Sequence, residues 1–156
     1  MKIAITLFCL FYASLAHAQI NFDELDLRMA KEKRYIVVYV HSRYCAPCLM
    51  QEAQINKDSL LLDRLKNDFY YVSMEAESSD SIIFNHQRFV NLQPKEKYGV
   101  NKFVRVYGEN KKGDLAYPLW LYFDKDYRLI LRFYGLMPPK DIRKVLDKIE
   151  EASVEK

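Results

Sequence analysis

Two cysteines separated by two residues are the part of this sequence best suited to chemistry. Cys45-Ala46-Pro47-Cys48 follows an apolar, β-branched run over residues 35–40 and precedes a stretch of helix-forming composition over residues 49–65. A dithiol at the start of a helix meets unpaired backbone N–H groups and the positive end of the helix dipole, and both favour the thiolate over the thiol. The spacing therefore predicts a redox centre.

The first 18 residues have the pattern of an export signal. Lys2 is followed by an apolar run over residues 3–15 and by Ala16-His17-Ala18, which places small residues at the two positions that signal peptidase inspects. The run is too short for a permanent membrane helix, so no stable membrane insertion is expected once the signal is removed. We expect cleavage after Ala18 and export of residues 19–156, to the periplasm or elsewhere outside the cytoplasm, as a soluble protein.

Cys9 within this leader offers an alternative, which is lipidation of the exported chain. Phe8 precedes it, where a lipidated cysteine normally follows a small residue, so cleavage after Ala18 is preferred. Removal of the leader leaves Cys45 and Cys48 as the only cysteines. A disulfide between them would close a very short loop and constrain the unfolded chain little, so the pair is poorly suited to a structural role.

The composition indicates one globular domain. Of the 156 residues, 50% are hydrophobic and 29% are charged, which is enough apolar material for a single core. The formal charge of +3 loses one unit with the leader, whose only charged residue is Lys2. Lysine and arginine are interspersed with aspartate and glutamate, so a nucleic-acid partner is not expected.

Hydrophobic periodicity predicts alternating helices and strands after residue 21. The expected elements are helices over 22–33 (capped by Asn21), 46–66 (interrupted within 56–59) and 138–150, and strands over 35–40, 69–74, 118–123 and 129–134. The first strand–helix–strand run implies a parallel crossover, and the last two strands form an antiparallel hairpin. Leu49 and Leu60 are expected to pack on the sheet with Leu61 and Leu65.

The stretch between residues 75 and 117 has a weaker pattern. Ser78-Ser79-Asp80 predicts a helix cap with a helix continuing to Phe89, and residues 95–100 predict a short helix or a turn. Residues 103–107 have the composition of an additional strand.

The order of these elements resembles the thioredoxin superfamily, with Tyr44-Cys45-Ala46-Pro47-Cys48 after the first core strand and Tyr117-Pro118 opening the third. Cys48-Leu-Met-Gln-Glu52 and Tyr134-Gly135 are similar to the thioredoxin-like domain of exported thiol:disulfide interchange proteins. The resemblance implies an α/β, thioredoxin-like fold over residues 19–156, with a central mixed β-sheet flanked by helices.

Two positions and one spacing depart from the family pattern. Tyr44 stands where a tryptophan usually precedes the first cysteine, and Tyr39 stands where many thioredoxins carry a buried acid. Proton transfer to or from Cys48 must then use another group or water. The 70 positions between Cys48 and Pro118 imply an insertion over about residues 76–116, before the cis-proline strand. Such an insertion could shape a partner-binding rim.

The two cysteines have different predicted roles. Cys45 lies at the exposed start of the helix, where the pKa of a thiol can fall to about 3.5–7.5, and is the predicted nucleophile. Cys48, one turn deeper, is the predicted resolving thiol. Ala46 and Pro47 complete the motif, and a proline is tolerated in the first helical turn.

Further supporting residues are expected near the cysteines. The resemblance implies that Pro118 is cis and that Tyr117 and Pro118 face Cys45, where they would hold an extended substrate segment by strand addition. Glu52, four residues after Cys48, shares its helix face, and is either a proton relay or a solvated glutamate.

His41 and Arg43 approach Cys45 along the chain, where a cation would favour the thiolate, although surface solvation is the preferred interpretation. Trp120 and its aromatic neighbours are expected to pack in the core.

These residues predict an exported thiol–disulfide oxidoreductase, favouring reduction, without a bound cofactor. Its expected partners are proteins with disulfides or dithiols and an unidentified electron-transfer protein. One alternative is a thiol-based carrier of copper or zinc, for which His41 and His86 are the only histidines outside the leader. Another is a thioredoxin-fold adaptor without redox activity.

Overall fold

The computed structural model describes residues 19–96 and 99–154, and its centre is a mixed β-sheet. The sheet has five strands in the order β1-β3-β2-β6-β7, in which β1, β3 and β2 are parallel and β6 is antiparallel to both β2 and β7. The strands are β1 (Gln19–Ile20), β2 (Tyr35–His41), β3 (Phe69–Glu75), β6 (Leu119–Phe123) and β7 (Leu129–Tyr134). The four predicted strands are therefore confirmed, and β1 is an addition.

The central strand β2 is buried on both faces. Ile36, Val38 and Val40 pack into the core on one side of the sheet, whereas Val37 and Tyr39 pack into the core on the other side. All five side chains are fully buried. This two-sided burial explains why the sequence of β2 is continuously apolar rather than alternating.

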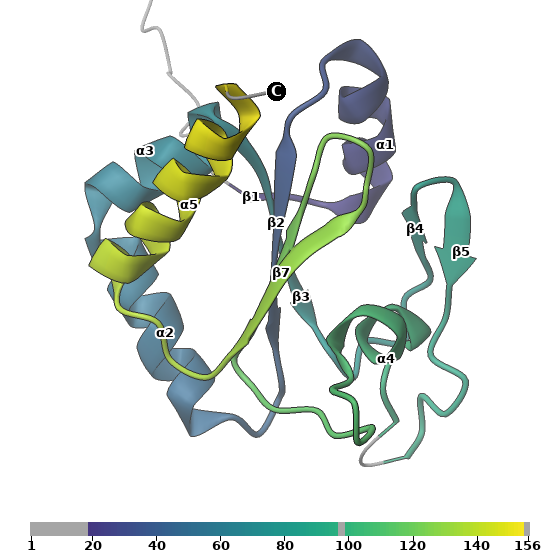
Figure 1. Cartoon of the computed structure of the whole chain (residues 1–156). Helices are drawn as coiled ribbons and strands as arrows, with labels where there is room; N and C mark the ends of the chain where they lie inside the picture. The colour runs from purple at the N-terminus through teal and green to yellow at the C-terminus, as the bar shows by residue number, and fades with distance from the viewer. Residues whose placement is uncertain (1–18, 97–98, 155–156) are drawn as a thin grey trace, which may run out of the picture.

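Helices cover both faces of the sheet (Figure 1). One face carries α2 (Ala46–Lys57), α3 (Ser59–Asn67) and α5 (Pro139–Val154). The other face carries α1 (Phe22–Lys31), α4 (Lys102–Gly108) and a hairpin formed by β4 (Ile82–Phe84) and β5 (Gln87–Phe89).

The predicted interruption of the helix after the cysteines is confirmed at Asp58. This residue ends α2 and begins α3, because its carboxylate accepts a hydrogen bond from the backbone N–H of Leu61 at 2.9 Å. The carboxylate also forms an ion pair with Arg143 on α5. Asp58 is thus both the C-cap of α2 and the N-cap of α3, and it joins this junction to α5.

The prediction of a helix from residues 78–80 to Phe89 is wrong, because β4 and β5 form a hairpin there. Asn85 and His86 make the turn with positive φ angles of 51° and 61°. Their backbone N–H groups donate to the carboxylate of Asp26 on α1, at 3.2 and 3.0 Å. A contact to a distant helix therefore selects the turn over a continuous helix.

The predicted strand over residues 103–107 is also wrong, because this segment belongs to α4. Asn101 caps the helix by accepting a hydrogen bond from the N–H of Phe103 at 3.0 Å. Phe103 and Val104 are buried while Val106 is 53% exposed, which is a helical rather than an alternating pattern. Just before α4, the described part of residues 95–100 forms a turn, and residues 97–98 lie outside the description.

An aromatic cluster joins the hairpin to the main core. The ring of Phe84 on β4 is fully buried, with centroid distances of 4.8 Å to Phe123, 5.0 Å to Tyr127 and 5.1 Å to Phe103. Phe22 on α1 completes the cluster, 5.2 Å from Phe103. The predicted insertion therefore contributes side chains to the hydrophobic core.

Within the described residues, no helix combines the length and the apolar character needed to cross a membrane. The predicted leader, its cleavage after Ala18 and Cys9 lie outside the described residues.

Candidate active site

Cys45 and Cys48 are joined in a disulfide at the N-terminus of α2. Cys45 is the N-cap residue, and its Sγ accepts a hydrogen bond from the backbone N–H of Cys48 at 3.1 Å. Pro47 lies in the first turn, where its missing N–H removes no helical hydrogen bond. A thiolate at Cys45 would therefore face a backbone donor and the positive end of the helix.

The two sulfurs differ in access. Cys48 is only 2% exposed, whereas Cys45 is partly exposed and Ala46 and Pro47 are exposed. This difference suits an outer attacking thiol and an inner resolving thiol.

Three large hydrophobic side chains next to the disulfide in the sequence are exposed. Tyr44 is 69% exposed, Leu49 70% and Met50 56%. The expectation that Leu49 and Leu60 pack on the sheet is wrong, since Leu60 is also exposed. The side chains that α2 buries instead are those of Cys48, Gln51 and Ile55.

Tyr39 lies beneath the start of α2. Its hydroxyl donates to the backbone carbonyl of Cys48 at 3.1 Å, and its ring lies 4.8 Å from that of Trp120, which is fully buried as expected. Burial, and then the charge of Glu52, raises the pKa of Tyr39 far above its ordinary value. The phenol stays neutral, so this position supplies a hydrogen-bond donor rather than a proton acceptor.

His41 and Glu52 form a pair beside Tyr39. Nδ1 of His41 lies 4.0 Å from Oε1 of Glu52, and the two side chains are 26% and 40% exposed. The His41 ring stacks on Tyr39 with a centroid distance of 5.9 Å. His41 is therefore not simply solvated at the surface, contrary to the expectation from the sequence. The Glu52 side chain is partly exposed.

Arg43 is exposed, and its guanidinium is directed to a carboxylate. Nη2 of Arg43 lies 2.5 Å from Oε1 of Glu75, and this hydrogen bond raises the pKa of Arg43. The charge of Arg43 is thus engaged in a surface ion pair.

The peptide bond between Tyr117 and Pro118 is cis, as the family resemblance implied. Pro118 is buried immediately before β6, and Leu119 of β6 lies opposite Val40 of β2. Because β2 and β6 are antiparallel, the chain leaves β2 toward Cys45 at the edge of the sheet where Pro118 enters β6. The two loops therefore emerge side by side.

Gln51 is a buried polar residue of this region that the sequence did not identify. It is fully buried, its Nε2 donates to the carbonyl of Met137 at 2.9 Å, and its Oε1 accepts from the N–H of Met137 at 2.7 Å. These two hydrogen bonds fix α2 to the loop between β7 and α5. The available signal was spacing, since Gln51 follows the buried Cys48 by three residues.

The described residues contain no group of three or more His, Cys, Asp or Glu side chains that could hold a metal ion. A structural zinc site normally has four protein ligands, and a catalytic one has three. Within the part of the chain that the structure describes, the cysteines are therefore not grouped with a third residue of these types in a metal-binding arrangement.

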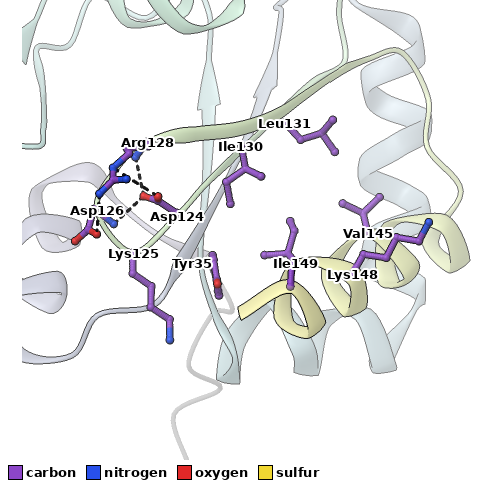
Figure 2. Close-up of a pocket in the computed structure, with 11 residues that line it drawn as sticks. Tyr35, Asp124, Lys125, Asp126, Arg128, Ile130, Leu131, Val145, Lys148 and Ile149 are labelled. Atoms are coloured by element: carbon purple, nitrogen blue, oxygen red, sulfur yellow. Dashed lines mark hydrogen bonds and ion pairs between the residues drawn. The ribbon is translucent and has the colours of Figure 1, made fainter. Parts of the chain in front are cut away.

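A cavity of about 710 Å³ lies between β7 and α5 (Figure 2). Its apolar wall includes Tyr35, Ile130 and Ile149, and Lys125 and Arg128 lie at one rim. Tyr35 begins β2, whereas Cys45 follows the other end of this strand, about 20 Å away along β2. The cavity is therefore separate from the disulfide.

Known proteins with a similar structure share little sequence with this chain. No family model matches the chain, and no curated protein matches it. A thioredoxin-fold protein from Helicobacter pylori is 18% identical with a TM-score of 0.60, over 80% of this chain and 73% of its own. A thioredoxin from Thermus thermophilus is 17% identical with a TM-score of 0.57, over 85% of this chain and 87% of its own. Chloroplastic thioredoxin z is 17% identical with a TM-score of 0.51, over 85% and 93%.

The chain therefore has the thioredoxin fold, in the α/β class, as the sequence predicted. On this fold, the Cys-x-x-Cys disulfide lies at the start of α2. A disulfide with its outer sulfur at a helix N-terminus has the arrangement that thiol–disulfide exchange requires.

Proposed function

We propose that this protein is an exported thiol–disulfide oxidoreductase that reduces disulfides in protein substrates. The observation that carries the proposal is the position of the Cys45–Cys48 disulfide, with the outer sulfur at the helix N-terminus and the inner sulfur buried. The exposed apolar side chains of Tyr44, Leu49 and Met50 favour a polypeptide substrate over a small polar thiol.

The reaction follows from the access of each sulfur. The Cys45 thiolate attacks one sulfur of a substrate disulfide, which forms a mixed disulfide and releases the other substrate sulfur as a thiolate that takes up a proton. Cys48 then loses its proton and attacks Cys45, which releases the second substrate thiol. Two electrons pass to the substrate, and Cys45–Cys48 becomes the disulfide.

Two loops are proposed to position the substrate. The cis bond at Tyr117–Pro118 lies beside the loop that carries Cys45, so an extended substrate segment can pair with backbone groups there. Glu52 is the proposed proton acceptor for Cys48, because it follows Cys48 by four residues on the same face of α2 and Tyr39 stays neutral. Return to the dithiol form needs a dithiol electron donor, which is the second proposed partner.

Insulin reduction tests the proposal. The reduced chain with one electron-donor system should accelerate insulin precipitation, Cys45→Ser should abolish the acceleration, and Cys48→Ser should accumulate a mixed disulfide with insulin on Cys45. Cys48 is buried, so Cys45→Ser should trap no insulin.

An inactive wild type together with no trapped species in Cys48→Ser would refute the exchange function. Export is tested separately by the N-terminus of the protein recovered after expression of the full chain, which should be Gln19. A chain that keeps residues 1–18 would contradict export with cleavage.

A further inference from the structure

The turn that presents Cys45 is tied to a carboxylate from the predicted insertion. The hydroxyl of Ser42 donates to Oε1 of Glu77, and the backbone N–H of Arg43 donates to Oε2 of Glu77 at 3.2 Å. The carbonyl of Ser42 in turn accepts a hydrogen bond from the N–H of Cys45 at 3.2 Å. Glu77 therefore holds the turn directly before the nucleophile.

Glu77 is itself fixed by the segment that follows β3. Its backbone carbonyl accepts a hydrogen bond from Nδ2 of Asn91 at 3.2 Å, and the same amide donates to the carbonyl of Gly99 at 3.0 Å. Asn91 is only 7% exposed. The backbone of Glu77 is thus held by Asn91 and by the preceding residue, Ala76, whose N–H donates to the carbonyl of His41 on β2 at 2.8 Å.

Glu77 also lies close to the cis-proline loop. The negative charge of Glu77 is the second cause, after burial, that raises the pKa of Tyr117. One carboxylate therefore contacts the loop before Cys45 and acts on the residue before Pro118.

The charges around Cys45 are mainly negative. The cation of the loop is Arg43, and it is paired with Glu75. The other ionisable groups of this region are Glu77, which follows β3, and the His41–Glu52 pair at the end of β2 and on α2. The phenols of Tyr44 and Tyr117 complete the set. A negative charge near a thiol disfavours the thiolate, and a less stable thiolate makes the dithiol a stronger reductant.

We propose that Glu77 is a positioning residue of the exchange site, which fixes the Ser42–Arg43 turn and keeps the dithiol reducing through its negative charge. The proposal deepens the function proposed above, since it gives a physical basis for reduction rather than oxidation. It also assigns a role to the segment after β3, because that segment places the carboxylate.

Glu77→Gln tests the charge, because glutamine keeps the length and one oxygen acceptor. Glu151→Gln is the matched control, since Glu151 is exposed on α5, away from the disulfide. The pKa of the Cys45 thiol is measured from the pH dependence of alkylation of the reduced protein. Glu77→Gln should lower this pKa by about 0.5 to 1, and Glu151→Gln should leave it unchanged.

The equilibrium with glutathione gives a second readout. Glu77→Gln should shift it toward the dithiol by up to about three- to tenfold, which corresponds to a rise in reduction potential of about 14 to 30 mV. Ser42→Ala removes one hydrogen bond and keeps the charge, so it should speed amide exchange at Cys45 without shifting the equilibrium.

An unchanged or higher pKa of Cys45 in Glu77→Gln, or an equal shift in Glu151→Gln, would overturn the role of Glu77. These measurements need no protein substrate. A wild type that fails to reduce insulin but shows the Glu77 effect would therefore contradict only the proposed function.

Discussion

Replacement of Gln51 by methionine is expected to loosen the active-site helix from the rest of the domain. The two hydrogen bonds between its amide and the backbone of Met137, at 2.9 and 2.7 Å, join α2 to the loop before α5. Both residues are buried, with exposures of 0% and 4%. Methionine keeps the side-chain length but leaves the N–H and the carbonyl of Met137 without these partners.

The magnitude follows from those two backbone groups. A buried polar group that loses its partner destabilises a protein by about 1–3 kcal/mol, so Gln51→Met should lower the free energy of unfolding by about 2–4 kcal/mol. For a domain of this length, the corresponding fall in Tm is roughly 6–15 °C. The loss should be present with the disulfide intact, because it does not depend on the cysteines.

Urea and thermal unfolding, followed by circular dichroism, measure this loss. Gln54→Met is the control on the same helix, since Oε1 of Gln54 is buried without a hydrogen-bond partner among the described residues and its removal therefore breaks no such bond. The control should leave the free energy of unfolding unchanged or raise it, because it removes a buried acceptor that has no partner. Equal losses in the two variants would refute the argument, because the effect would then come from the substitution type and not from the contacts to Met137.

Two further predictions concern carboxylates that join distant elements. The carboxylate of Asp26 accepts hydrogen bonds from the β4–β5 turn and from the hydroxyl of Tyr127. Asp26→Ala should therefore destabilise the domain by about 2–3 kcal/mol and speed amide exchange in that turn. Amide exchange no faster than in the control Asp23→Ala would contradict this. Hydrogen bonding from the first turn of α3, and then the ion pair with Arg143, lowers the pKa of Asp58. The contribution of the Asp58 carboxylate to the free energy of unfolding is therefore present above about pH 4 and is lost as the pH falls through the folded-state pKa. The stability difference between wild type and Asp58→Asn, about 0.5–1 kcal/mol near pH 7, should therefore shrink on acidification, and a constant difference in urea unfolding between pH 7 and pH 2.5 would exclude this linkage.

The strands of the main sheet other than β1 could be predicted because their signals are local. The continuous apolar run of β2 reflects burial on both faces, and the break at Asp58 coincides with a residue that caps helices well. The cysteine pair could be predicted as a redox site for the same reason, since the preceding strand, the motif and the following helix lie within one short stretch of sequence. The cis bond before Pro118 followed from the family resemblance and not from local pattern.

The segment between β3 and β6 could not be predicted because distant contacts decide its structure. The turn at Asn85 and His86 depends on Asp26, which is about 60 residues earlier. The run over 103–107 has the β-branched and aromatic composition of a strand, but the cap at Asn101 and burial of Phe103 select a helix. Local propensity is a weak guide where tertiary contacts outweigh it.

The same limit applies to the site. Gln51 interacts with a residue 86 positions away, and Ser42 with one 35 positions away. The spacing from Cys48 places Gln51 on the buried face of α2 but does not identify its partner, and no neighbour of Glu77 in the sequence indicates its role. Only the fold brings such residues to the cysteines.

The ring of Phe84 limits how this protein can change over evolution. The rings of Phe22, Phe103 and Phe123 come from three different elements, and they rely on the hairpin for part of their burial. A lineage that shortened the hairpin would expose these rings to water at once, so it would need compensating substitutions on all three elements. The length of the β4–β5 hairpin should therefore covary among related sequences with the aromatic residues at positions 22, 103 and 123.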